Sequence, residues 1–109
     1  MKQVENLYYI RVKNITGTTA VGRTEKHTYY NMDIMVETDS YAAAKLMTTN
    51  GKKTLNAIND AIAHYSGEDL STPDGVEKLK YRITGNLAEA YRTNKISNIY
   101  MEKYLFQNK

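Results

Sequence analysis

The sequence predicts an α+β domain in which two helices cover one face of a small antiparallel or mixed sheet. Two observations support this class. Apolar and polar residues alternate over residues 4–13 and 28–37, which is typical of half-buried strands. From residue 40 onward apolar residues recur every three or four positions, which is typical of helices. Alternation returns over residues 96–106, so the predicted element order is β-β-α-α-β.

Length and composition limit the possibilities. The chain has 109 residues, enough for a single domain over residues 1–109 with its own core. It has no cysteine, which excludes disulfides and thiolate metal sites. The net charge is only +3 and no block of like charges is present. No apolar run approaches the roughly 20 residues that a membrane helix requires.

The first strand is predicted over residues 4–13. One face of this strand carries Val4, Tyr8, Ile10 and Val12, and the other carries Tyr9, Arg11 and Lys13. Residues 14–23 are rich in Gly and Thr, which favours a long hairpin connection. The second strand alternates most clearly: Thr28, Tyr30, Met32, Ile34 and Val36 share the face that we expect in the core.

The first helical region is predicted from Tyr41, with Asp39 or Ser40 as its N-cap. Its apolar stripe is interrupted at Asn50-Gly51, where we expect a kink or break. Gly67 is expected to end this region as the residue after the C-cap. The stripe consists of Ala44, Met47, Gly51, Leu55, Ile58, Ile62 and Tyr65.

The second helix is predicted from Pro73 to about Thr93, ending at Asn94. Thr72 is a suitable N-cap, and Pro73 then occupies the first helical position, where its missing N–H is not needed. Asp74 is placed to pair with Lys78 one turn later. Its core face carries Val76, Leu79, Ile83, Leu87 and Ala90.

The last strand, residues 96–106, has apolar residues on both faces. Ile99, Met101 and Leu105 oppose Tyr100, Tyr104 and Phe106. A strand of this kind is usually central or covered on both sides, and we predict the same here.

No group of residues indicates catalysis. Asp33 and Glu37 share a strand face and are interpreted as its solvated side. His64 and Glu68 have a spacing that suits two metal ligands, but Gly67 separates them and a site needs three or four ligands. We therefore predict no enzyme activity, no cofactor and no metal site.

Nucleic-acid binding is the alternative function. Tyr8, Tyr9, Arg11 and Lys13, with Tyr29 and Tyr30 on the next strand, would mix aromatic and basic groups on a sheet surface. Such a surface can stack the bases of single-stranded nucleic acid. The low net charge and the acids Asp33 and Glu37 disfavour it. We predict no nucleic-acid partner and keep a small single-stranded nucleic-acid-binding module as the alternative.

One segment is more distinctive than the rest. Residues 68–80 read EDLSTPDGVEKLK, and residues 29–107 as a whole resemble the periplasmic domain of the FliL family of flagellar basal-body proteins. The matching motif residues are Glu68, Asp69, Leu70, Thr72, Pro73, Gly75, Glu77 and Leu79, followed by Asn86 and then by Ile96, Ile99, Tyr100, Tyr104 and Gln107. Residues 53–60 depart from the family pattern, because they lack its proline and arginine.

The resemblance implies a stomatin/prohibitin-like (SPFH-like) fold and a non-enzymatic role in the flagellar motor. Proteins of this family are held in the inner membrane by an N-terminal helix, with this domain in the periplasm. They associate with the stator, the MotA/MotB-like proteins, and form homo-oligomeric rings that support swimming and swarming motility. We expect this chain to be the periplasmic part, without the membrane helix.

A head-to-tail ring needs two different patches on each copy. The candidates chosen from the sequence are the connection around Gly17 to Arg23 and, at the expected opposite end, Glu68 and Asp69. Arg23, Glu68 and Asp69 are therefore the candidate oligomer or partner contacts.

Overall fold

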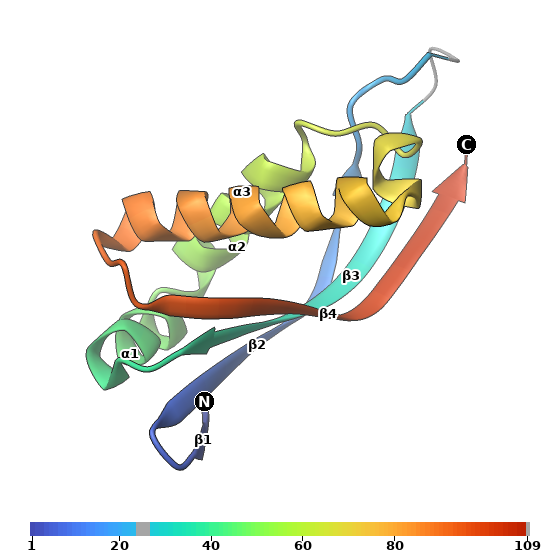
Figure 1. Ribbon diagram of the computed structural model, residues 1–109. Helices are drawn as coiled ribbons and strands as arrows, with labels where there is room; N and C mark the ends of the chain where they lie inside the picture. Colours follow the sequence, from blue (N-terminus) through green and yellow to red (C-terminus); the bar gives the residue numbers. More distant parts are fainter. Residues whose placement is uncertain (24–26, 109) are drawn as a thin grey trace.

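A computed structural model, which describes residues 1–23 and 27–108, has the predicted α+β class but not the predicted order β-β-α-α-β, since the described residues form four strands and three α-helices (Figure 1). Its elements are β1 (Lys2–Val4), β2 (Leu7–Thr18), β3 (Thr28–Thr38), α1 (Tyr41–Thr49), α2 (Gly51–Ile62), the 3-10 turn η1 (Asp69–Ser71), α3 (Pro73–Tyr91) and β4 (Ile96–Asn108). The four strands form one antiparallel sheet in the order β1-β2-β3-β4. The helices pack on one face of this sheet, as predicted.

The N-terminal strand differs from its prediction at both ends. The alternating segment 4–13 is not continuous, because the chain turns at Glu5, which has a φ of 55°, and Lys2–Val4 folds back on Leu7–Tyr9. The Gly- and Thr-rich segment is also not all connection. β2 continues to Thr18 through a bulge at Asn14, which has a φ of 56°. Asparagine tolerates this left-handed conformation better than most residues.

The inner face of β3 was predicted correctly. Thr28, Tyr30, Met32, Ile34 and Val36 are all buried beneath the helices. Most of the predicted core is confirmed: Tyr30, Ile34, Val36, Met47, Ile58, Ile62, Leu79, Ile83 and Leu87 are buried. Val76 and Ala90 of the predicted core face are only partly buried, and Gly51 is exposed. Side chains absent from the prediction complete the core, notably Ile15 of the extended β2 and Leu70 of η1.

β4 lies at an edge of the sheet, so the prediction of a central or doubly covered strand is wrong. The register explains its apolar pattern. Ile99 and Met101 lie opposite Val36 and Ile34, whereas Tyr104 lies opposite Met32, so one extra residue is accommodated near Glu102. This bulge reverses which residues face inward. Ile99 and Tyr104 therefore share the inner face, and Leu105 is 56% exposed on the outer one.

The helical region breaks at Asn50-Gly51 as predicted, giving α1 and α2. Ser40 is the N-cap, since its hydroxyl accepts a hydrogen bond from Ala43 N at 3.1 Å. The predicted end at Gly67 is wrong: α2 ends at Ile62. The second helix, α3, begins at Pro73 as predicted and ends at Tyr91, with Arg92 in the left-handed conformation.

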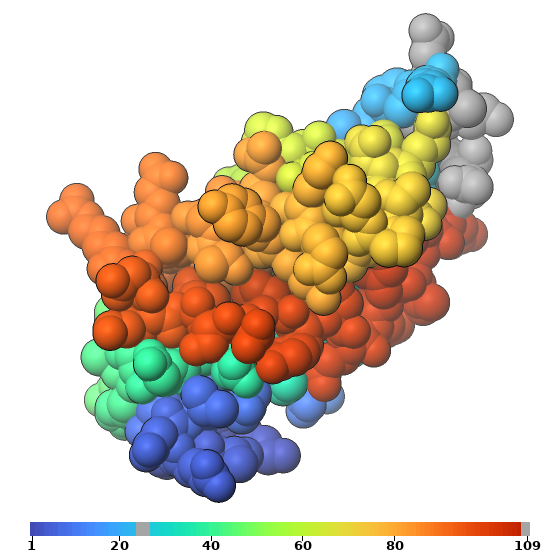
Figure 2. Space-filling view, viewed as in Figure 1, coloured from blue at the N-terminus to red at the C-terminus, as the bar shows by residue number. Residues whose placement is uncertain are grey.

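The arrangement leaves one face of the sheet without helices. α1 and α2 contact β2, and α3 lies along β4, where the two form a continuous surface (Figure 2). No helix in the described part of the chain is both long enough and apolar enough to span a membrane.

Candidate functional site

The motif segment begins with a reciprocal cap between Ser66 and Asp69. Ser66 N donates to Asp69 Oδ2 at 3.1 Å, and Asp69 N donates to Ser66 Oγ at 3.1 Å. This exchange resembles the capping box that begins many helices. Asp69, one of the candidate contacts, therefore holds the start of η1 in place.

The next part of the motif joins η1 to α3. Thr72 caps α3 as predicted: its hydroxyl accepts from Gly75 N at 3.0 Å and donates to the carbonyl of Asp69 at 3.0 Å. Pro73 occupies the first turn. Gly75 is required for a separate reason, since a Cβ there would lie 1.7 Å from the Asp69 oxygen. The backbone of η1 thus packs directly against α3.

Two buried leucines and a tyrosine attach this junction to the core. Leu70 and Leu79 are fully buried. Tyr104 of β4 donates its hydroxyl to the carbonyl of Leu70 at 2.8 Å, and burial raises the pKa of Tyr104 to about 12. The predicted pair of Asp74 and Lys78 also forms, at 3.2 Å on the surface.

The two remaining motif residues, Glu68 and Glu77, are exposed. Glu77 pairs with Lys80 at 3.4 Å. Glu68 lies against the connection between β2 and β3: a Cβ on Gly22 would lie 2.5 Å from its Oε1. Next to it, Ala20 N donates to the carbonyl of Tyr65 at 2.9 Å.

These contacts correct the placement of the candidate contacts. The connection that carries Arg23 and the turn that carries Glu68 and Asp69 lie at the same end of the molecule (Figure 1). They were expected at opposite ends. Arg23, Glu68 and Asp69 can therefore contribute to one surface patch, whereas a head-to-tail contact needs a second patch elsewhere.

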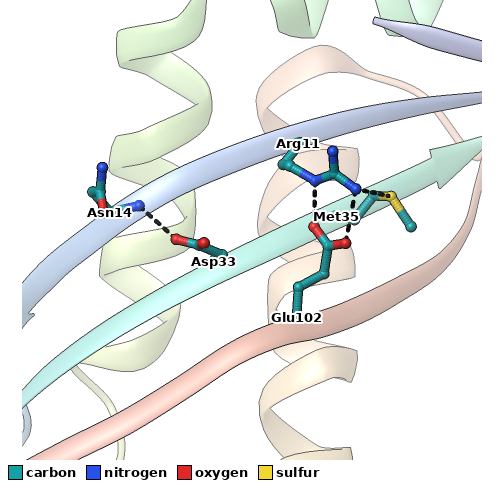
Figure 3. A network of polar contacts seen from close by, with 5 residues as sticks. All are labelled: Arg11, Asn14, Asp33, Met35 and Glu102. Carbon is teal, nitrogen blue, oxygen red and sulfur yellow. Dashed lines mark hydrogen bonds and ion pairs between the residues drawn. The ribbon is translucent and has the colours of Figure 1, made fainter.

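The uncovered sheet face carries a second set of polar contacts. We call it the outer face and define it by Tyr9, Arg11, Tyr29, Asn31, Asp33, Met35, Glu37, Asn98, Tyr100, Glu102 and Leu105. At its middle, Arg11 of β2 reaches across β3 to Glu102 of β4 (Figure 3), with Nε–Oε1 at 2.5 Å and Nη2–Oε2 at 2.8 Å. This bidentate pair joins the two strands that flank β3.

Glu37 lies at the end of the outer face near Thr38. It is only 6% exposed, so its interpretation as part of a solvated face is wrong. Asn98 Nδ2 donates to its Oε2 at 2.8 Å and the Tyr100 hydroxyl to its Oε1 at 3.1 Å. Hydrogen bonding, first from Asn98 and also from Tyr9 and Tyr100, lowers the pKa of Glu37. The same bonds raise the pKa of Tyr9 and Tyr100.

The opposite end of the outer face is more apolar. Tyr29 is 42% exposed and Leu105 56% exposed, and both line a shallow hollow of about 900 Å³ together with Thr16, Thr18 and Asn31. Asn31 Oδ1 is buried there and accepts no hydrogen bond from the described residues.

The surface proposed for nucleic acid is divided between the two faces. Tyr8 and Tyr30 are on the inner face, opposite Thr38 and Gly17, and Tyr30 is buried. Arg11 is paired with Glu102, and Tyr9 lies opposite Glu37. The aromatic and basic groups therefore do not form one basic stacking platform.

His64 and Glu68 also do not have the geometry of a metal site. α2 ends before His64, so the helical spacing of His64 and Glu68 does not apply. The described residues contain no group of three or more His, Cys, Asp or Glu side chains that could hold a metal ion.

The outer-face cluster was missed from the sequence. Tyr9 and Glu37 each lie on the more polar phase of a strand, whereas Tyr100 is distinguished only by its place in a strand that is apolar on both faces and by its match to the family. These residues lie close together only because of the register of β2, β3 and β4. Asn98 belongs to no pattern that the sequence shows.

The fold and the motif junction define an α+β domain whose signature residues hold one helix start against the sheet. Among protein families, the model described as flagellar basal body-associated protein FliL matches residues 9–107. The match spans nearly the whole chain, so the protein belongs to the FliL family and is an accessory protein of the flagellar motor. No curated protein sequence matches the chain.

Proposed function

We propose that this domain works in the periplasm, held at the inner membrane by a helix N-terminal to it, and associates with the flagellar stator. It would be non-enzymatic, would form a homo-oligomeric ring around the MotB-like linker and would raise motor output in swimming and swarming. The observation that carries this proposal is the family match over residues 9–107. The likeness to the stomatin/prohibitin fold is part of the same proposal.

The mechanism would be a population shift. A ring that binds the active stator more tightly than the inactive one stabilises the active form by the difference in binding free energy. A separate domain would self-associate weakly, because a shared membrane raises the effective concentration of neighbouring copies. The mass of the purified domain at several concentrations tests this part.

One side of the ring contact is proposed at the patch that contains Arg23, Glu68 and Asp69. Arg23, Glu68 and Asp69 belong to one end of the molecule, where Glu68 is exposed beside Gly22. Asp69 also caps Ser66, so its replacement would disturb the junction. Glu68 and Arg23 are therefore the better positions for testing a contact.

The test uses the complete membrane-anchored protein. Arg23→Glu, Glu68→Lys and a full deletion are compared for spreading in soft agar and for recruitment of the stator to the motor. We expect the deletion to reduce both, and each reversal to reduce them in part. Wild-type behaviour of the deletion would disprove the role in stator support. A defect in the deletion alone would reject only the Arg23–Glu68 patch.

A further inference from the structure

The outer face contains one acidic group that is buried and takes part in no ion pair formed by the described residues. Its acids are Asp33, Glu37 and Glu102. Glu102 is paired with Arg11. Asp33 is more exposed than Glu37, lies opposite Lys103 in the strand register and accepts a hydrogen bond from Asn14 N at 2.8 Å. Glu37 takes part in none of the ion pairs formed by the described residues.

The hydrogen bonds to Glu37 do not supply the missing positive charge. Asn98 and Tyr100 are neutral donors, as is Tyr9, which lies directly opposite Glu37. Such donors favour the ionised carboxylate and leave its charge in place. Arg11, two residues from Tyr9 on the same face, donates instead to Glu102 and towards Met35 Sδ. A negative charge therefore remains beneath a surface made largely of two tyrosines.

Those tyrosines make the position suitable for a particular cation. Tyr100 is 39% exposed, and Tyr9 is half-buried on the other side of Glu37. The face of an aromatic ring attracts cations, and a nearby carboxylate adds to this attraction. A guanidinium group fits best, because it is planar, stacks on aromatic rings and donates several hydrogen bonds in its own plane.

We propose that Tyr9, Glu37 and Tyr100 form a binding site for an arginine side chain of a partner protein. The site lies on the face that none of the described helices covers, so a partner can approach it directly. The assignment of the partner to the flagellar motor rests on the proposed function. The existence of the arginine site does not depend on the proposed function.

The experiment titrates the whole 109-residue chain with N-acetyl-arginine amide and follows the ring resonances of Tyr9 and Tyr100 by NMR. N-acetyl-citrulline amide is the matched probe, because it has nearly the same shape without the charge. We expect saturable shifts with the arginine compound at millimolar concentration and much smaller shifts with citrulline.

Two variants and a control assign the site. Glu37→Gln keeps the shape of the side chain and removes its charge, and should weaken binding at least about tenfold, which corresponds to about 1.4 kcal/mol. Tyr100→Leu removes one ring, leaves Glu37 in place and should also weaken it. Glu89→Gln on α3 changes the net charge equally and should leave binding unchanged. Backbone amide spectra establish whether each variant is folded. If Glu37→Gln is not folded, the result for Tyr100→Leu alone tests the proposal.

Three results would overturn the proposal: no saturable shift in the wild-type chain, equal shifts with citrulline, or equal weakening by Glu89→Gln. None of them bears on the motility of the deletion strain. Failure of the arginine site and failure of the flagellar role are therefore distinguishable.

Discussion

In the junction formed by residues 66–79, polar side chains bond mainly to nearby backbone, whereas on the outer face they bond mainly to other side chains. Thr72 contacts Gly75 N and the Asp69 carbonyl, and Asp69 contacts Ser66 N. On the outer face Arg11 contacts Glu102, and Asn98 contacts Glu37. The first kind of bond fixes a local conformation. The second depends on which strands lie side by side.

Polar residues therefore have different roles in the two regions. The motif in residues 68–79 is accounted for mostly by the start of α3, and only Glu68 and Glu77 of its residues take no part in the junction contacts described above. The outer face, as defined above, includes only Tyr100 of the residues that match the family, yet it contains a buried carboxylate without an ion pair and exposed aromatic rings. Substitutions in the two regions should consequently affect different measurements.

The largest expected effect on stability is in the junction. Gly75→Ala places a Cβ 1.7 Å from the Asp69 carbonyl oxygen, so backbone must move. The gain of about 1 kcal/mol in helix propensity is smaller than an overpacking cost of about 1–3 kcal/mol or more. We expect net destabilisation in urea unfolding.

Gly85 of the same helix is the matched control, because a Cβ there meets nothing within 4 Å. Gly85→Ala should stabilise by about 0.4–1 kcal/mol. If the two glycine variants had the same effect, the close approach of η1 to α3 would be wrong.

Removal of the cap should have the next largest effect. Thr72→Ala deprives Gly75 N of its acceptor and should cost about 0.5–2 kcal/mol. Thr72→Ser keeps the hydroxyl and should lose much less. Thermal unfolding of the three proteins measures the difference, and an unchanged melting curve for Thr72→Ala would contradict the cap.

The bond that ties the junction to the sheet should contribute less. Tyr104→Phe removes the hydroxyl that donates to the Leu70 carbonyl and should destabilise by about 0.5–1.5 kcal/mol. Tyr81→Phe is the control, because Tyr81 is 84% exposed on α3. Equal stability of the two variants in urea would mean that the Tyr104 hydrogen bond makes no net contribution to the free energy of unfolding.

The outer face should instead respond to pH. Hydrogen bonds lower the folded-state pKa of Glu37, so its stabilising effect is present above the unfolded pKa of about 4.3. It is lost as the pH falls through the lower folded-state pKa. The free energy of unfolding of Glu37→Gln should therefore depend less on pH below about 4.3 than that of the wild type. Parallel curves would show that Glu37 does not contribute.

The smallest expected effect is on nucleic acid. Because Arg11 is paired and Tyr8 and Tyr30 face the helices, we predict no salt-sensitive affinity for single-stranded RNA or DNA. Fluorescence polarisation at low and physiological salt tests this. A micromolar complex that weakens steeply with salt and is lost in Arg11→Ala would favour the nucleic-acid-binding module over the flagellar role.

The sequence alone determined the features that depend on neighbouring residues. The cap at Thr72, the start of α3 at Pro73, the break at Asn50-Gly51 and the buried face of β3 follow from local bonds and from periodicity. The motif in residues 68–79 rests on the same local pattern, because most of its residues serve one helix junction.

Tertiary structure decided everything that depends on pairing between strands. The turn at Glu5, the bulges near Asn14 and Glu102 and the edge position of β4 follow from the sheet register. A single bulge exchanges the faces of all residues that follow it, so alternation in β4 could not show which side was buried. For the same reason only the folded sheet brings Tyr9, Glu37 and Tyr100 together, since their chain separation carries no information about strand register.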